Sequence, residues 1–147
     1  MRYEEIIAGF RGLQAEDFDY MNVSARGSER LAELTEALMS TPDAEKAIPE
    51  LFNVMERLPD ADLGSPGPLV HTLERFHGYE KEFVRSVRRQ PSVLSVWMVN
   101  RILNTELSDD TRRAYIGLLN EASAHPLAPE AVRQDVRGFI ELQMRKT

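Results

Sequence analysis

The chain has 147 residues, of which 42% are apolar and 29% charged, as is typical of one globular domain. Its 24 acidic and 18 basic residues give a net charge of −6, which argues against binding nucleic acid or an anionic membrane through bulk charge. Cysteine is absent, which excludes disulfides, thiol catalysis and Cys-based zinc sites. We expect a single cytoplasmic domain over residues 1–147, with no leader and no membrane span.

Apolar residues recur at helical spacing through almost the whole chain, and no segment alternates in the manner of a strand. The predicted helices cover residues 3–13, 28–40, 43–59, 68–77, 79–89, 92–104, 108–120 and 129–145. The segment 92–104 is apolar nearly all round, so we expect it to be the central buried helix. Its Trp97 is expected to serve core packing.

Several hydroxyl residues and prolines stand where helices are expected to begin. Ser28 and Ser108 are predicted N-caps, and Ser65 is predicted to cap the helix that starts near residues 66–68. Thr41 and Pro42 are predicted to open the helix over 43–59. Pro49 interrupts that helix, which therefore either kinks there or starts afresh near residue 48.

The order of the helices favours an all-α fold of seven or eight helices. Residues 51–58 align with residues 69–76 at a shift of 18, which indicates similar amphipathic helices. Residues 47–52 (Ala-Ile-Pro-Glu-Leu-Phe) are similar to the opening of the second helix of a HEAT-type repeat. The prediction is a set of antiparallel helix pairs, stacked in a HEAT-like manner or packed as an irregular helical bundle.

The sequence contains no complete catalytic or metal-binding motif. His71, Glu74 and His77 share one helix face but lack the spacing of a His-Glu-x-x-His zinc motif. The segment from Asp60 to Gly64 begins like a calcium loop, but its later positions lack the required Gly and Glu. No nucleophile elbow or phosphate-binding glycine pattern occurs. We therefore expect no enzyme activity, no catalytic residue, no metal and no cofactor.

A basic run on the helix over 79–89 allows two interpretations. Arg85, Arg88 and Arg89 share a face opposite the apolar stripe and are suited to binding phosphate. The preferred interpretation is a solvated face that pairs with Glu80 and Glu82.

The acidic charge is distributed unevenly along the chain. Residues 1–62 hold 14 acids and 6 bases, a net charge of −8, whereas residues 63–147 hold 10 acids and 12 bases, a net charge of +2. Such a polarised surface steers a basic protein, although it is also compatible with an ordinary solubilising face. The predicted partner-binding residues are the acids Glu16, Asp17, Asp19, Glu29, Glu33, Glu36, Asp60 and Asp62.

Two segments resemble a known class of proteins. Residues 63–71 (Leu-Gly-Ser-Pro-Gly-Pro-Leu-Val-His) and residues 96–104 (Val-Trp-Met-Val-Asn-Arg-Ile-Leu-Asn) are similar to small all-α bacterial immunity proteins of polymorphic and contact-dependent toxin systems. The similarity in helix layout extends over residues 44–145. It implies a short, cytosolic, often HEAT-like protein that binds and blocks one cognate toxin domain, frequently a nuclease.

Two functions from different classes are therefore expected from the sequence. The first is an immunity protein that covers the active site of a basic nuclease toxin with its acidic surface. The second is a helical-repeat adaptor whose protein partner is unrelated to toxins, which a concave apolar groove would favour. A third hypothesis, which is not the expected one, is a small hydrolase or metal-dependent enzyme that uses His71, Glu74 and His77. Bound metal would favour it.

Overall fold

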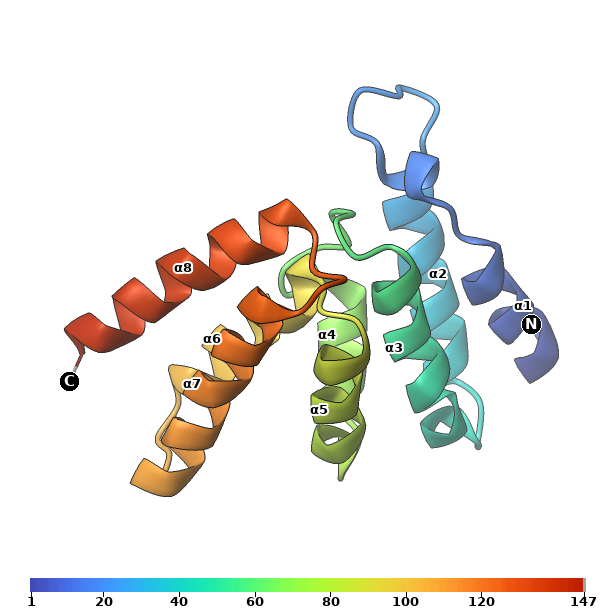
Figure 1. Cartoon of the computed structure of the whole chain (residues 1–147). Helices are drawn as coiled ribbons and strands as arrows, with labels where there is room; N and C mark the ends of the chain where they lie inside the picture. Colours follow the sequence, from blue (N-terminus) through green and yellow to red (C-terminus); the bar gives the residue numbers. More distant parts are fainter. Residues whose placement is uncertain (147) are drawn as a thin grey trace.

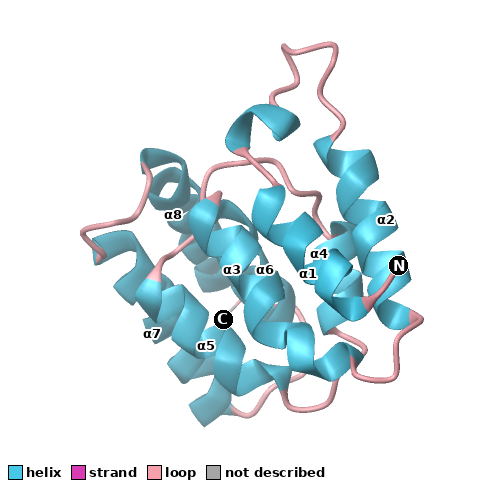
Figure 2. Ribbon diagram, turned by 90° about the vertical axis from the view of Figure 1, so that its right-hand side faces the viewer, coloured by secondary structure: helices cyan, strands magenta, loops and turns pink. Residues whose placement is uncertain are grey.

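The computed structural model describes residues 1–146, and every regular element in that range is helical (Figure 1; Figure 2). The α-helices are α1 (Tyr3–Gly12), α2 (Gly27–Met39), α3 (Ile48–Arg57), α4 (Gly67–Leu73), α5 (Tyr79–Arg89), α6 (Val93–Leu103), α7 (Asp109–Ala124) and α8 (Glu130–Arg145). Two short 3-10 turns, η1 (Ala15–Phe18) and η2 (Ala44–Ala47), precede α2 and α3. The prediction of an all-α chain with seven or eight helices is confirmed.

The helices pack as consecutive pairs in two layers. Contacts join α1 to α2, α3 to α4, α5 to α6, and α7 to α8. Next-but-one helices also touch, from α1 through α3 and α5 to α7 in one layer, and between α2 and α4 and between α6 and α8 in the other. The chain runs up and down between two ends, which makes paired helices antiparallel (Figure 1). Stacked helix pairs produce this pattern of contacts.

The buried apolar side chains form one continuous cluster that extends from α1 to α8. The helix α6 lies against α5, α7 and α8, and it buries residues on nearly every side, including Val96, Met98 and Val99. This arrangement confirms the expected central helix. Trp97 is only partly buried, however, and it packs against the edge of the cluster.

Serine side chains cap two helices, at Ser92 and at Ser108, and of these only Ser108 was a predicted N-cap. The Ser92 hydroxyl accepts from the Ser95 backbone N–H at 3.0 Å, and the Ser95 hydroxyl accepts from the Ser92 N–H at 3.0 Å. This reciprocal pair satisfies donors that the first turn of α6 leaves free. The Ser108 hydroxyl accepts from the Thr111 N–H at 3.1 Å and opens α7 in the same way.

Three other predicted helix starts are wrong. The N-cap position of α2 is occupied by Arg26, and Ser28 lies inside the helix. Pro66 occupies the N-cap position of α4, and no side chain caps that helix, so Ser65 has no capping role. The Thr41 hydroxyl donates to the Leu38 carbonyl oxygen at 2.7 Å, which closes α2 instead of opening the next helix.

The helix predicted over residues 43–59 is divided in two. A 3-10 turn occupies Ala44–Ala47, and α3 then begins at Ile48 with Pro49 in its first turn. A proline there removes no helical hydrogen bond, because the first N–H groups of a helix have no partner within it. The helix therefore starts afresh, and it is the first member of its pair with α4.

The loops gather at two ends of the molecule. The connections after α1, α3, α5 and α7 lie at the upper end in Figure 1, and those after α2, α4 and α6 lie at the lower end. The upper connection between η1 and α2 projects clear of the helices in both ribbon views (Figure 1; Figure 2). Within residues 1–146, no helix has both the length and the apolar character needed to cross a bilayer.

Candidate functional site

Five of the eight predicted partner-binding acids lie at the upper end of the molecule. Glu16 and Asp17 belong to η1, and Asp19 follows it at the start of the projecting loop. Asp60 and Asp62 lie in the connection between α3 and α4, which reaches the same end (Figure 1). The fold therefore places acids that are about forty residues apart in sequence on one end of the stack.

The other three predicted acids form a separate stripe on α2. Glu29, Glu33 and Glu36 are all exposed, as the spacing of the residues predicts. Arg26 lies 3.9 Å from Glu29, and Arg30 lies 3.5 Å from Glu33. These basic side chains on the same helix offset part of the stripe, so its net charge is smaller than the acids alone suggest.

The acids at the upper end differ in how their oxygens are used. Asp17 accepts from the Gln14 backbone N–H at 2.7 Å and so holds the start of η1. Asp19 and Asp62 each accept from the N–H two residues later, at 2.9 Å and 3.1 Å, and shape their loops. The carboxylates of Glu16 and Asp60 bond to no side chain or backbone group in the described range, and both residues are exposed to solvent.

The loop between η1 and α2 carries apolar side chains into solvent. The exposed fractions are 92% for Tyr20, 74% for Met21 and 91% for Val23. The loop is held by its own hydrogen bonds, among them Asn22 N–H to the Asp19 carbonyl at 2.9 Å and Ser24 N–H to the Asn22 side chain at 3.0 Å. Aromatic and Met side chains exposed together beside charged residues are typical of protein interfaces.

The close packing of η1 on α2 fixes the base of this loop. A Cβ atom at Gly27 would lie 2.5 Å from the Asp17 carbonyl oxygen, so only glycine fits at the first position of α2. The turn that carries Glu16 and Asp17 is thereby locked against the helix, and the loop leaves from a rigid base.

A cavity of about 400 Å³ opens between the α3–α4 connection, α6 and α8. Its apolar wall includes Val93, Trp97 and Phe139, and its polar groups include Asp60, Asp62 and Asp135. Val93 is tied to the same connection, because its backbone N–H donates to the Pro59 carbonyl oxygen at 2.7 Å. The volume lies within the range of pockets that hold small ligands or single side chains.

Asp135 is the member of this cavity that sequence reasoning missed. It lies partly buried on α8, and no hydrogen bond or ion pair joins its carboxylate to the rest of residues 1–146. Burial raises the pKa of its carboxyl group above the ordinary value, because desolvation disfavours the charged form. In the sequence, Asp135 looks like any acid on the polar face of a helix. Only the folded structure reveals that it lines a cavity together with Trp97 and Asp60.

The predicted alternatives for metal chemistry find little geometric support. His71 and His77 are exposed, and Glu74 instead accepts two hydrogen bonds from Arg101, at 2.9 Å and 3.1 Å. Among residues 1–146, no group of three or more His, Asp or Glu side chains is arranged to hold a metal ion.

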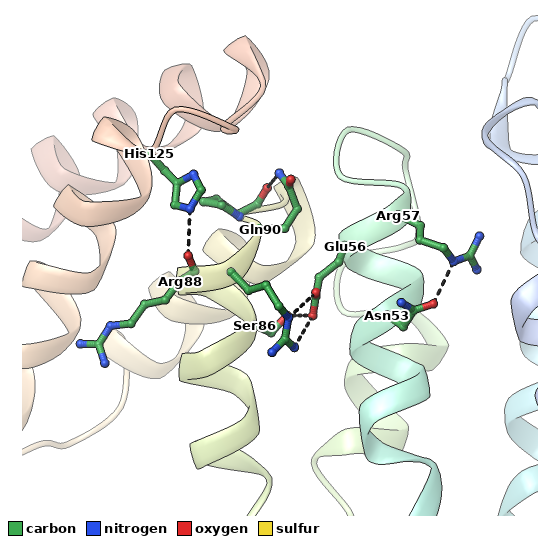
Figure 3. Close-up of polar contacts among 9 residues, drawn as sticks. Asn53, Glu56, Arg57, Ser86, Arg88, Gln90 and His125 are labelled. Carbon is green, nitrogen blue, oxygen red and sulfur yellow. Dashed lines mark hydrogen bonds and ion pairs between the residues drawn. The ribbon is translucent and has the colours of Figure 1, made fainter.

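The basic run on α5 pairs mostly with other helices. Arg85 binds Glu82 on its own helix at 2.6 Å, as one interpretation expected. Arg89 instead donates to both oxygens of Glu56 on α3, at 2.7 Å and 2.8 Å, and the buried Ser86 hydroxyl donates to the same carboxylate at 2.8 Å (Figure 3). Arg88 lies 3.3 Å from Glu121 on α7. The run thus joins α5 to both neighbouring helices of its layer.

Comparison with protein-family models, with curated proteins and with solved structures finds no match to this chain. The candidate surface is therefore defined by its own geometry, namely the projecting loop, the acids at its base and the acidic cavity at the same end.

Proposed function

We propose that this chain is a binding protein that neutralises a basic protein, and that the partner is the cognate toxin domain of a polymorphic or contact-dependent system. The protein would act by covering the active site of the toxin, which we expect to be a nuclease. It would need no cofactor. The resemblance of residues 63–71 and 96–104 to immunity proteins supports the choice of a toxin among basic partners.

The projecting loop is the observation that carries this proposal. Tyr20, Met21 and Val23 gain nothing from exposure to water, since burying each of them in an interface would be favourable by about 1.5–3 kcal/mol. Large exposed apolar side chains with a rigid base suit the centre of an interface, where a few residues supply most of the binding energy. The acids Glu16, Asp17 and Asp19 then form the rim on one side.

The charge of the same end supplies the electrostatic part of the proposal. Acids at the rim of an interface raise the rate of encounter with a basic partner and contribute less to the dissociation rate. A nuclease active site is built to accept phosphate and is therefore basic, so an acidic end is complementary to it. Binding is expected to weaken as salt is raised.

The test takes as its candidate partner the C-terminal domain encoded by the reading frame beside this gene, which the proposal requires to be basic. Its binding to the purified chain is measured kinetically at low and high salt for two sets of variants. Glu16→Lys with Asp60→Lys is expected to slow association by about tenfold or more at low salt and to flatten the salt dependence. Tyr20→Ala is expected to speed dissociation by about thirtyfold, as for an interface anchor.

A matched double reversal provides the control. Glu106→Lys with Glu141→Lys changes the net charge equally on exposed residues of the other half, and it is expected to have a much smaller effect. Equal effects of the two reversals would contradict the placement of the interface. A neighbouring product that does not bind, or whose toxicity is not relieved by co-expression of this chain, would contradict the proposed function and favour the adaptor.

A further inference from the structure

The cavity between the α3–α4 connection, α6 and α8 combines two properties that rarely occur together on a protein surface. Its walls are largely apolar, with Val93, Trp97 and Phe139 partly buried in them. Three carboxylates, those of Asp60, Asp62 and Asp135, also line it. An occupant must therefore offer both an apolar body and a positive charge.

No basic side chain of the chain itself satisfies these carboxylates. The lining residues include no Lys or Arg in the described part of the chain. The carboxylates of Asp135 and Asp60 bond to none of residues 1–146, and Asp62 uses one oxygen for the Gly64 N–H at 3.1 Å. The guanidinium of Arg101, on α6, lies 5.6 Å from the ring centre of Trp97. Glu74 already holds this group with two hydrogen bonds.

The apolar walls select among cations. A hydrated metal ion keeps its water and gains little from aromatic walls, and an ammonium group is more strongly hydrated than a guanidinium and lacks its planar fork of donors. A guanidinium is planar and weakly hydrated, it stacks on aromatic rings, and it donates to carboxylates in a fork. Its aliphatic stem also buries apolar surface along the walls. A volume of about 400 Å³ is sufficient for one such side chain.

We propose that this cavity is a receptor for one arginine side chain of the protein partner, with Asp135 and Asp60 binding the guanidinium and Trp97 and Phe139 enclosing its stem. The assignment rests on the proposed function, because it supplies a specific contact for a basic partner. It adds a defined pocket to an interface that charge alone would leave without a fixed register.

The pocket can be tested without the partner, because Trp97 is the only tryptophan of the chain. The probe is N-acetyl-arginine amide, and its isostere N-acetyl-citrulline amide replaces the guanidinium by a neutral ureido group. Tryptophan fluorescence and the backbone amide NMR shifts of Gly64 and Val93 are followed during titration. Saturable binding in the millimolar range is expected for the arginine probe, with at least tenfold weaker binding for the citrulline probe.

A conservative pair of variants locates the binding. Asp135→Asn keeps the shape of the side chain and is expected to weaken the arginine probe at least fivefold. Asp43→Asn, at an exposed acid outside the cavity, is expected to leave binding unchanged. Non-saturable shifts, equal binding of the two probes, or equal effects of the two variants would overturn the pocket.

A second arm separates this inference from the proposed function. The affinity of the basic neighbouring domain is measured for the wild type and for Asp135→Asn. A loss of fivefold or more supports the assignment to the partner. Unchanged affinity overturns it while leaving the proposed function intact. If the probe binds the cavity but the domain does not bind the chain at all, the proposed function fails and the pocket alone remains.

Discussion

The Asp135 side chain is expected to lower the stability of the folded protein while it contributes to binding the partner's guanidinium. Its carboxylate is partly buried against an apolar wall and has no partner among the described residues, so the folded state gives it a poorer environment than water does. A guanidinium that enters the cavity would remove this penalty. The residue is therefore expected to have opposite effects on folding and on binding.

The effect of Asp135 on stability should depend on pH in a defined direction. Its raised pKa in the folded state means that the folded protein binds a proton more tightly than the unfolded chain does. The resulting loss of stability is fully present above the folded pKa and disappears below the unfolded value of about 3.9. Asp135→Asn is expected to raise the melting temperature at pH 7, with a gain that shrinks as the pH falls toward 4.

The matched control for this prediction is Glu141→Gln, an exposed acid on the same helix. Glu141→Gln should change the melting temperature little at pH 7, and this small change should not shrink as the pH falls toward 4. A destabilising Asp135→Asn at pH 7 would show that the carboxylate makes a favourable contact in the folded state.

Single residues were predictable from the sequence only where the signal is local. Ser108 caps α7, as predicted, because its hydroxyl meets the N–H group three residues ahead. Ser28 fails as a cap because α2 already begins at Gly27, on which η1 packs, so Ser28 lies inside the helix. Asp135 could not be singled out, because its character depends on a loop some seventy residues away.

At the scale of elements, arginines from one helix repeatedly close the C-terminal end of another. Arg57 on α3 donates to the carbonyls of Phe10, in the last turn of α1, and of Leu13, its C-cap, at 2.8 Å and 3.0 Å. Arg133 on α8 donates to the Ser123 and His125 carbonyls at the end of α7, at 3.2 Å and 3.0 Å. The last carbonyls of a helix lack partners within it and carry partial negative charge, so a guanidinium satisfies both needs.

Removal of one such contact should cost more than removal of a surface ion pair. Arg57→Ala leaves the end of α1 without its donors, and hydrogen bonds to charged groups contribute about 1.5–3 kcal/mol. We expect the free energy of unfolding to fall by about 1–3 kcal/mol in urea titrations. Arg113→Ala is the control, since within residues 1–146 that exposed side chain pairs only with Asp110, and surface pairs contribute about 0–1 kcal/mol. Equal losses would contradict a capping role.

The elements themselves were largely predictable, and their mutual contacts were not. Apolar periodicity located all eight helices because a helix face that packs on the core must repeat every three to four residues. The same pattern does not indicate which helix lies opposite. The basic run on α5 was expected to pair with Glu80 and Glu82, yet Arg89 binds Glu56 on α3, because stacking brings those helices together.

The molecule as a whole is a stack in which each pair contacts mainly its neighbours. The pairs α1/α2 and α7/α8 have neighbours on one side only, whereas α3, α5 and α6 are covered on both sides. Stability in such a stack is approximately the sum of each pair's own stability and its contacts with neighbours. Opening should therefore begin at the ends.

Native-state hydrogen exchange followed by NMR tests this gradient. Amides in α3, α5 and α6 are expected to exchange only through global unfolding. Those in α1 and α8 should exchange about tenfold faster or more, through partial opening. Equal protection along the chain would show that the stack unfolds as one cooperative unit.

The uneven distribution of charge along the chain could be read from the sequence, but the positions of the acidic residues in space could not. Residues 1–62, with a net charge of −8, form α1 to α3 and the start of the next connection. Five predicted acids meet at the upper end because α1 and α3 both ascend to it, whereas the acids of α2 extend down the flank (Figure 1). The antiparallel course of the paired helices therefore separates the acids at the upper end from those along α2.

The projecting loop between η1 and α2 has a consequence for how such a protein diversifies. Its residues bond mainly to one another, and Tyr20, Met21 and Val23 contribute nothing to the core. Lineages can therefore alter its sequence or length while the stack beneath remains unchanged, since exposed loops tolerate substitution and insertion. A descendant chain could acquire a new partner through a few changes in this loop and keep its folding behaviour intact.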